Sequence, residues 1–394
     1  MSSRHVTTER AQVRLLQAAS ATSSFDRFVV GPLLVTIAAD FDVTLAGAAA
    51  VASLYFLLYG LSQPVWGLCS DRFGRVRTMR TTLAAACVFG VLSAFAPTLG
   101  LLVLARALTG ACIAAAVPSA LVYVGDVVPF ARRQGVLTDL NAASALGITS
   151  AIGLGGVLAA TVGWRAAFLL PAVLAGALAL VLARLPEPPR GADKQGGLAT
   201  ALRSTWGRRV LLLALVEGAA LLGLLTYLAP AVESRGATPT EAGGLVALYG
   251  VGLLLTSRVV KRLAGRVPAP AFLAVGSGAL VLAYTAVAVS QAPALVALAA
   301  LVVGAGWAAM HSTMQAWATE VVPAARATLV SLFAASLFVG SGVATAVLAP
   351  LAGDLRWGPL FGVGVALSAA FGVAATFATL RFARAGRVPA PAVP

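Results

Sequence analysis

Long apolar segments recur along the whole chain, separated by short polar stretches that contain charges, proline or glycine. An α-helix needs about 20 apolar residues to cross a hydrocarbon core of about 30 Å, and most of these segments are that long. Runs such as 169–182 lack the alternation of apolar and polar residues that a membrane-spanning β-barrel requires. The pattern therefore predicts an all-α membrane protein.

The segments predict twelve transmembrane helices in two groups of six. The predicted spans lie near 14–39, 46–67, 78–96, 99–124, 134–161, 166–184, 210–231, 241–261, 270–290, 294–317, 325–350 and 357–380. The long polar stretch between the groups is rich in proline and glycine, which is typical of a linker. We expect an N-terminal six-helix bundle over 1–184, a cytoplasmic linker over 185–209 and a C-terminal six-helix bundle over 210–394.

The composition agrees with a chain in lipid, since 59% of the residues are hydrophobic and 11% are charged. The net charge of +14 does not predict a nucleic-acid partner, because the basic residues form short groups between apolar segments. With a cytoplasmic N-terminus, 23 of the 28 Lys and Arg fall in inner segments. The positive-inside rule then predicts a multi-pass protein of a bacterial inner membrane with both termini in the cytoplasm.

The two groups of helices carry an internal repeat. The segment Asp126-Val-Val-Pro-Phe-Ala-Arg132 reappears as Glu320-Val-Val-Pro-Ala-Ala-Arg326, at an offset of 194 residues, and Pro32 has a counterpart in Pro230. Duplication of a six-helix unit keeps its orientation, so the halves should be related by an axis along the membrane normal. This arrangement predicts a binding site between the halves near the midplane, and alternating access by rocking.

A glycine- and arginine-rich turn follows the second span. Its sequence is Gly67-Leu-Cys-Ser-Asp71-Arg72-Phe-Gly74-Arg75. The arginines could be simple anchors at the inner leaflet, but the ordered spacing resembles the signature loop of the major facilitator superfamily.

The resemblance covers nearly the whole chain and implies a role for that turn. In the family it is a conformational latch in which the acid faces a helix end of the other half and the arginines pair with an acid after span four. These roles map onto Gly67, Asp71, Arg72, Gly74, Arg75 and Asp126. The second-half copy around Arg266 lacks the acid, so we expect one latch only.

Two further segments resemble motifs of proton-coupled exporters in this superfamily. The run 102–110 places Arg106 inside the fourth span, and 147–156 lies where the fifth-helix antiporter motif is expected. Ala151 and Ile152 replace the Gly-Pro of that motif, so its glycines could equally serve close helix packing.

Four charges fall deepest in the predicted spans: Asp26, Arg27, Arg106 and Glu217. A charge at the bilayer centre costs about 2.5–3.5 kcal/mol, so these groups need partners or water. We predict that Asp26 carries a proton, that Arg106 tunes it, and that Glu217 is a second titrating or substrate-facing acid. The alternative is a structural ion pair with no role in transport.

Aromatic and methionine side chains share faces of the second and tenth spans, where they could contact substrate or simply pack between helices. The predicted substrate-binding residues are Arg27, Tyr55, Tyr59, Trp307, His311 and Met314.

Together these features predict a proton antiporter that exports small organic molecules, with an importer of an anionic or zwitterionic metabolite as the alternative. Its expected partners are the substrate, protons and membrane lipid, and we expect a monomer. Two histidines, three scattered cysteines and no HExxH motif predict neither an enzyme nor any metal or cofactor. A receptor without solute flux would not need titratable groups between the halves.

Overall fold

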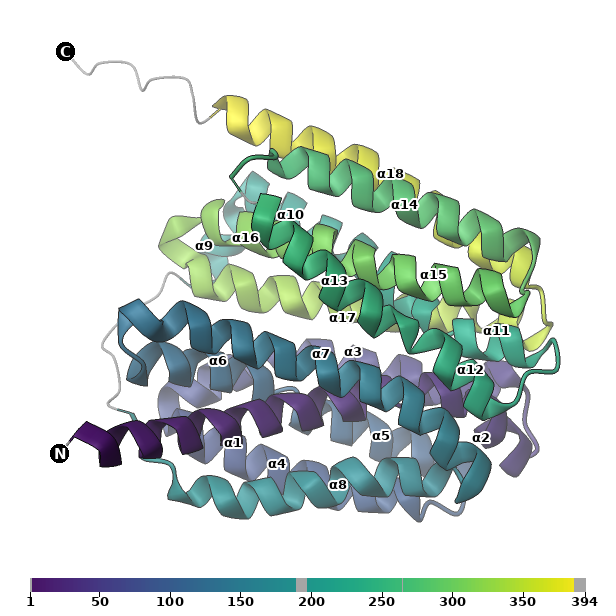
Figure 1. Ribbon diagram of the computed structural model, residues 1–394, viewed down its shortest axis with the longest axis horizontal. Coiled ribbons are helices and arrows are strands. Elements are labelled where there is room, and N and C mark those ends of the chain that lie inside the picture. The colour runs from purple at the N-terminus through teal and green to yellow at the C-terminus, as the bar shows by residue number, and fades with distance from the viewer. Residues whose placement is uncertain (1, 189–196, 264, 386–394) are drawn as a thin grey trace.

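The computed structural model describes residues 2–188, 197–263 and 265–385, and its elements are helices. Figure 1 shows two helical bundles side by side, one formed by the N-terminal part of the chain and the other by the C-terminal part. The start of α1 and the end of α18 lie at the same end of the molecule, which we call the basic end because the arginine-rich turn between α3 and α4 lies there too. The other end is called the opposite end.

The N-terminal bundle contains α1 (Ser2–Phe28), η1 (Gly31–Leu33), α2 (Leu34–Asp40), α3 (Leu45–Phe73), α4 (Arg75–Ala94), α5 (Leu99–Ile113), α6 (Ala116–Val127), α7 (Phe130–Thr161), α8 (Trp164–Val181) and η2 (Leu182–Arg184). The short helix α9 (Leu198–Arg203) lies inside the segment predicted as a linker.

The C-terminal bundle contains α10 (Thr205–Gly218), η3 (Ala219–Gly223), α11 (Leu228–Glu233), α12 (Pro239–Val246), α13 (Leu248–Leu263), α14 (Ala269–Val289), α15 (Pro293–Gly306), η4 (Trp307–His311), α16 (Ser312–Glu320), η5 (Pro323–Ala325), α17 (Arg326–Gly353) and α18 (Trp357–Ala385). Two of these, η3 and η4, are single π-helical turns within longer helices.

Ten helical stretches of the described chain are long and apolar enough to cross a membrane. The other two predicted spans correspond to α4 and to α1 followed by α2. Both carry several arginines, which lowers their hydropathy, but they pack with the other helices of the N-terminal bundle (Figure 1). The chain is therefore a multi-pass, all-α membrane protein.

Two prolines interrupt the first helix of each bundle at matching places. Proline has no N–H to donate to the carbonyl four residues earlier, and its ring clashes there, so a proline inside a helix can kink or break it. Accordingly α1 ends at Phe28, four residues before Pro32. The seventh span is interrupted at Thr226, four residues before Pro230. The repeat in the sequence thus places two helix breaks opposite each other, and a side chain at Gly31 would contact the Thr226 carbonyl at 3.6 Å.

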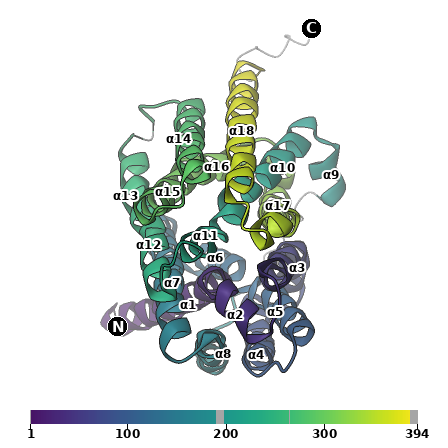
Figure 2. The ribbon, with the colours of Figure 1, turned by 90° about the vertical axis from the view of Figure 1, so that its right-hand side faces the viewer.

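The two bundles meet along two seams, α3 against α17 and α7 against α12 (Figure 2). Glycines permit these close approaches. A Cβ at Gly60 of α3 would lie 2.8 Å from the Ala335 carbonyl oxygen of α17, and one at Gly156 of α7 would lie 3.1 Å from Cα of Gly243 in α12. Small residues at helix crossings are the usual way in which membrane helices approach closely.

Candidate functional site

An ion pair lies buried inside the N-terminal bundle. Nη1 of Arg106 donates to Oδ1 of Asp26 at 2.7 Å, and Nη2 donates to the Asp26 backbone carbonyl, also at 2.7 Å. The hydroxyl of Tyr55 donates to the other carboxylate oxygen at 2.7 Å. Arg106 is fully buried and Asp26 is 1% exposed. The sequence predicted that these charges need partners, and here they find them in each other.

Three helices supply this cluster. Asp26 lies in the last turn of α1, just before the proline-induced break, Arg106 lies midway along α5, and Tyr55 comes from α3. The guanidinium of Arg106 also lies over the rings of Tyr55 and Phe168, at 4.5 and 4.4 Å from their centroids. Aromatic faces attract cations most strongly where water is excluded, so the rings further stabilise this buried arginine.

Arg27, the next residue along α1, is held differently. Its Nη1 donates to the Tyr59 hydroxyl at 2.8 Å and its Nη2 to the Ser24 hydroxyl at 3.3 Å. Its guanidinium lies 4.9 to 5.1 Å from the ring centroids of Phe28, Tyr59 and Phe338. Phe338 belongs to α17, so Arg27 lies at the boundary between the two bundles.

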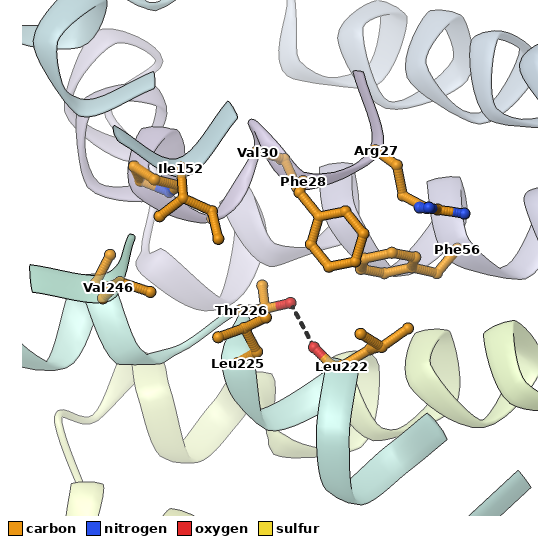
Figure 3. A pocket seen from close by; sticks show the side chains of 12 residues that line it. Arg27, Phe28, Val30, Phe56, Ile152, Leu222, Leu225, Thr226 and Val246 are labelled. Carbon is orange, nitrogen blue, oxygen red and sulfur yellow. Dashed lines mark hydrogen bonds between the residues drawn. The ribbon is translucent and has the colours of Figure 1, made fainter. Parts of the chain in front are cut away.

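A chamber opens beside Arg27, between the two helix breaks. It is lined by Arg27, Phe28, Val30, Gly31, Pro32, Phe56, Ile152, Leu222, Leu225, Thr226, Ala229 and Val246. Figure 3 shows the side chains of α1 on one side and those of the seventh span on the other, where the Thr226 hydroxyl donates to the Leu222 carbonyl at 3.1 Å. In this conformation the chamber has room for about one or two water molecules.

A second buried acid lies in the C-terminal bundle. Glu217 is fully buried, and Nδ1 of His311 lies 3.5 Å from its Oε1, an ion-pair distance without a hydrogen bond. His311 is stacked between Trp307 and Phe333, at centroid distances of 4.2 and 5.6 Å. Glu217 lies near the end of α10, just before the π-helical turn η3. His311 is the last residue of the other π-helical turn, η4. Single π-helical turns occur frequently at functional sites.

The tenth-span residues predicted to share one face have different surroundings. Trp307 and His311 are half-buried and stack on each other, whereas Met314 is fully buried. Trp317 packs against Trp206 and Phe382, with centroids at 6.2 and 5.9 Å. Tyr55 and Tyr59 were predicted as substrate contacts. In the structure the Tyr55 hydroxyl donates to Asp26, and the Tyr59 hydroxyl accepts a hydrogen bond from Arg27.

The arginine-rich turn lies at the basic end. Gly74 ends α3 with φ of +108°, a conformation that side chains rarely adopt. Arg75 pairs with Asp71 and, at 3.3 Å, with Asp126, which is the pairing the family resemblance implies. A Cβ at Gly67 would lie 3.9 Å from the Ser331 hydroxyl of α17, so this end of α3 faces the other bundle. The guanidinium of Arg72 lies over the ring of Phe73, 5.5 Å from its centroid.

Glu187 also contacts this turn, a contact that was not predicted from the sequence. Its carboxylate accepts the backbone N–H groups of Val76 and Arg77, at 3.1 and 3.0 Å, in the first turn of α4. A negative charge at a helix N-terminus is favourable by about 0.3–1 kcal/mol. The segment that leaves the N-terminal bundle is therefore attached to the turn at Gly74.

The aromatic partners of the buried charges were not predicted. Phe28, Phe168, Phe333 and Phe338 surround Arg27, Arg106 and His311, yet each is one phenylalanine within an apolar helix. Nothing in such a run distinguishes a ring over a cation from a ring in lipid. The one available signal was the charge itself, since a buried arginine requires a partner nearby.

Comparisons with known proteins place this geometry in a family. The profile described as Major Facilitator Superfamily matches residues 18–345. The inner membrane transport protein YdhP of Escherichia coli K12 is 31% identical over 243 residues, 59% of this chain and 61% of that protein. Efflux pump apf11 of Gibberella fujikuroi is 25% identical over 233 residues, 58% of this chain and 41% of the pump. The matched region thus spans less than two thirds of either relative.

Solved structures share the fold. A bacterial homologue of the human lysosomal transporter Spinster, inward-facing and unoccupied, superposes with a TM-score of 0.75 at 19% identity, covering 94% of this chain and 98% of that one. A D-xylose-proton symporter superposes with a TM-score of 0.77 at 16% identity, covering 94% and 97%. The profile match over most of the chain shows that this protein belongs to the major facilitator superfamily, and the solved structures share its fold.

Proposed function

We propose that this protein exports a small organic molecule by proton antiport, with alternating access of a site between the two bundles. The observation that carries the proposal is the buried Asp26–Arg106 pair, which lies one residue away from the chamber residue Arg27. This places the proposed proton carrier beside the residues proposed to bind the substrate. The relatives described as an efflux pump and an inner membrane transport protein support this function.

The chemistry follows from the contacts of Asp26. With the carboxylate ionised, Arg106 and Tyr55 both bond to it, and the last turn of α1 is fixed against α5 and α3. Protonation removes the negative charge that Arg106 faces, which weakens the pair and frees α1 to move. Because α1 also carries Arg27 into the chamber, proton binding and substrate binding act on one helix end. Glu217, beside His311, is proposed as a second titrating or substrate-facing acid.

The proposed location is a bacterial inner membrane with the basic end in the cytoplasm. The arginine-rich turn, the start of α1 and the end of α18 share that end (Figure 1), and the positive-inside rule expects such a basic face in the cytoplasm. An importer of an anionic or zwitterionic metabolite is the second candidate, favoured by the positive charge of Arg27. Protection of cells from a toxic substrate supports export, and growth on an imported one supports uptake.

The decisive experiment replaces Asp26 with asparagine, which keeps the size of the side chain and a hydrogen-bonding oxygen for Tyr55. Uptake into everted vesicles under an imposed pH gradient, screened over lipophilic cations, anions and neutral antibiotics, first identifies a transported solute. We expect Asp26→Asn to reduce gradient-driven uptake at least tenfold while exchange without a gradient persists. The matched control is Asp40→Asn, which alters an exposed pair with Arg165 at the opposite end. Undiminished proton coupling in Asp26→Asn contradicts the proposal.

A second prediction concerns the turn at the basic end. Asp71→Asn removes the charge that faces Arg75, so the turn should no longer bias the two conformations of the protein. We expect slower transport with unchanged amounts of protein in the membrane, measured by initial rates and immunoblotting. Asp354→Asn, an exposed acid at the opposite end, is the control. Wild-type turnover in Asp71→Asn would show that the turn has no such role.

A further inference from the structure

Arg27 is a buried cation without a carboxylate partner. It is 9% exposed, and no described acid forms an ion pair with it, because the neighbouring Asp26 is turned toward Arg106. Its hydrogen bonds go to two neutral hydroxyls, and its Nε has no partner. Taking a charge out of water costs several kcal/mol even after relaxation, so an unneutralised guanidinium here requires a reason.

The surroundings of Arg27 indicate what could neutralise it. Asp26 and Arg106 cancel each other, so the group of three charges at the end of α1 carries one net positive charge. Apart from Thr226, whose hydroxyl donates to the Leu222 carbonyl, the remaining side chains of the chamber wall are apolar. They come from both bundles, with Phe28 and Phe56 on one side and Leu222 and Leu225 on the other (Figure 3). A guanidinium binds carboxylate and sulfonate groups with several directed N–H donors. An apolar wall favours an apolar body next to that group.

We propose that the chamber binds an amphiphilic organic anion, a molecule with a single carboxylate or sulfonate that pairs with Arg27 and an apolar body that contacts Phe28, Phe56 and Leu222. Rotation of the bundles must widen the chamber to admit it, since the closed chamber holds about one or two water molecules. The inference rests on the proposed transport function and specifies its substrate class. The aromatic rings around Arg27 then serve to hold the cation in place while the anion is absent.

The test uses three ligands that share one apolar body: 4-phenylbutyrate, 4-phenylbutylamine and 4-phenylbutanol. Affinity is measured from the ligand-dependent rise in thermal unfolding temperature of the purified full chain in dodecyl maltoside. We expect the carboxylate to bind wild-type protein at least tenfold more tightly than the amine or the alcohol. Equal binding of the three ligands, or none by the carboxylate, overturns the proposal without any variant.

Variants assign the effect to Arg27. Arg27→Gln should weaken 4-phenylbutyrate at least tenfold, which is about 1.4 kcal/mol, and leave the alcohol unchanged. Arg27→Lys keeps the charge and should retain most of the affinity, and it also serves if the glutamine variant does not fold. The matched control Arg165→Gln removes an arginine that is exposed and paired with Asp40. Unchanged carboxylate affinity in Arg27→Gln contradicts the assignment.

An anionic lipid headgroup offers the same chemistry as a soluble anion. Repeating the measurement in nanodiscs of phosphatidylcholine, with and without phosphatidylglycerol, separates the two sources. Competition by phosphatidylglycerol would assign Arg27 to a lipid and overturn the proposal of a soluble substrate, whereas unchanged affinity supports it. Ligand binding needs no proton gradient, so failure here is distinguishable from failure of the proton-coupled function, which the Asp26→Asn experiment tests separately.

Discussion

An Arg106→Met variant should be less stable than the wild type by about 3–5 kcal/mol, because it leaves the Asp26 carboxylate buried with only Tyr55 to bond it. Methionine fills a similar volume, so the loss reflects the unpaired charge more than a cavity. The measurement is the apparent unfolding temperature in detergent, together with the yield of monodisperse protein. The variant should also lose gradient-driven transport.

Two comparisons isolate the cause of that destabilisation. Arg165→Met breaks the exposed Arg165–Asp40 ion pair, whose N–O distance of 2.8 Å is close to the 2.7 Å between Arg106 and Asp26. It should lower the free energy of unfolding by no more than about 1 kcal/mol. The double variant Asp26→Leu with Arg106→Met removes both charges and should regain most of the stability, because apolar replacement of a whole buried pair is often neutral. It should remain inactive in proton-driven transport. If Arg106→Met alone were as stable as the wild type, Asp26 would have to be neutral or hydrated in the folded protein.

A single added methyl group at Gly156 should prevent the bundles from closing at the opposite end. Its Cβ would meet the Pro239 carbonyl oxygen and lie 3.1 Å from Cα of Gly243, both backbone atoms of α12 that have no rotamer by which to yield. We expect Gly156→Ala to fold but to transport at least tenfold more slowly, since the proposed alternating access needs this closed state.

Spin labels report the geometry of that change directly. Pairs at Val162 and Thr240, both exposed at the opposite end, should show a longer distance in Gly156→Ala than in the parent protein. Gly153→Ala is the matched control on the same helix, because its Cβ would contact Ala247 at an ordinary 3.7 Å. An unchanged distance distribution and normal transport in Gly156→Ala would show that the seam between α7 and α12 adapts to the methyl group.

Hydropathy predicted the fold class well because lipid imposes a simple condition. Every spanning segment must satisfy its own backbone hydrogen bonds, so long apolar runs become helices whatever their partners are. Helix interruptions were harder to place. The predicted spans 14–39 and 210–231 ran through Pro32 and Pro230 as single helices, whereas the structure breaks both before the proline. The repeat noted in the sequence contained these prolines, but only packing shows that the two breaks face each other.

The charged residues of the candidate site were predicted from the sequence, as was an interaction between Asp26 and Arg106, whereas the aromatic partners and the Glu217–His311 contact were not. Asp26, Arg27, Arg106 and Glu217 stand out because charges in apolar segments are expensive. Which of them pair depends on how helices rotate and pack. Two adjacent residues of α1 diverge, Asp26 toward Arg106 and Arg27 toward the aromatic rings at the bundle boundary.

By itself the sequence predicted an all-α membrane protein with an internal repeat and a signature turn, because hydropathy, repeat spacing and charge are properties of short stretches. The tertiary structure decided that Asp26 is neutralised within one bundle, that Glu217 meets His311, and that Arg27 stays an unpaired cation beside the chamber. These outcomes depend on contacts between different helices, such as that of Arg106 with Asp26, 80 residues apart in the chain. Distances across helices follow from close packing of whole bundles, which no local pattern records.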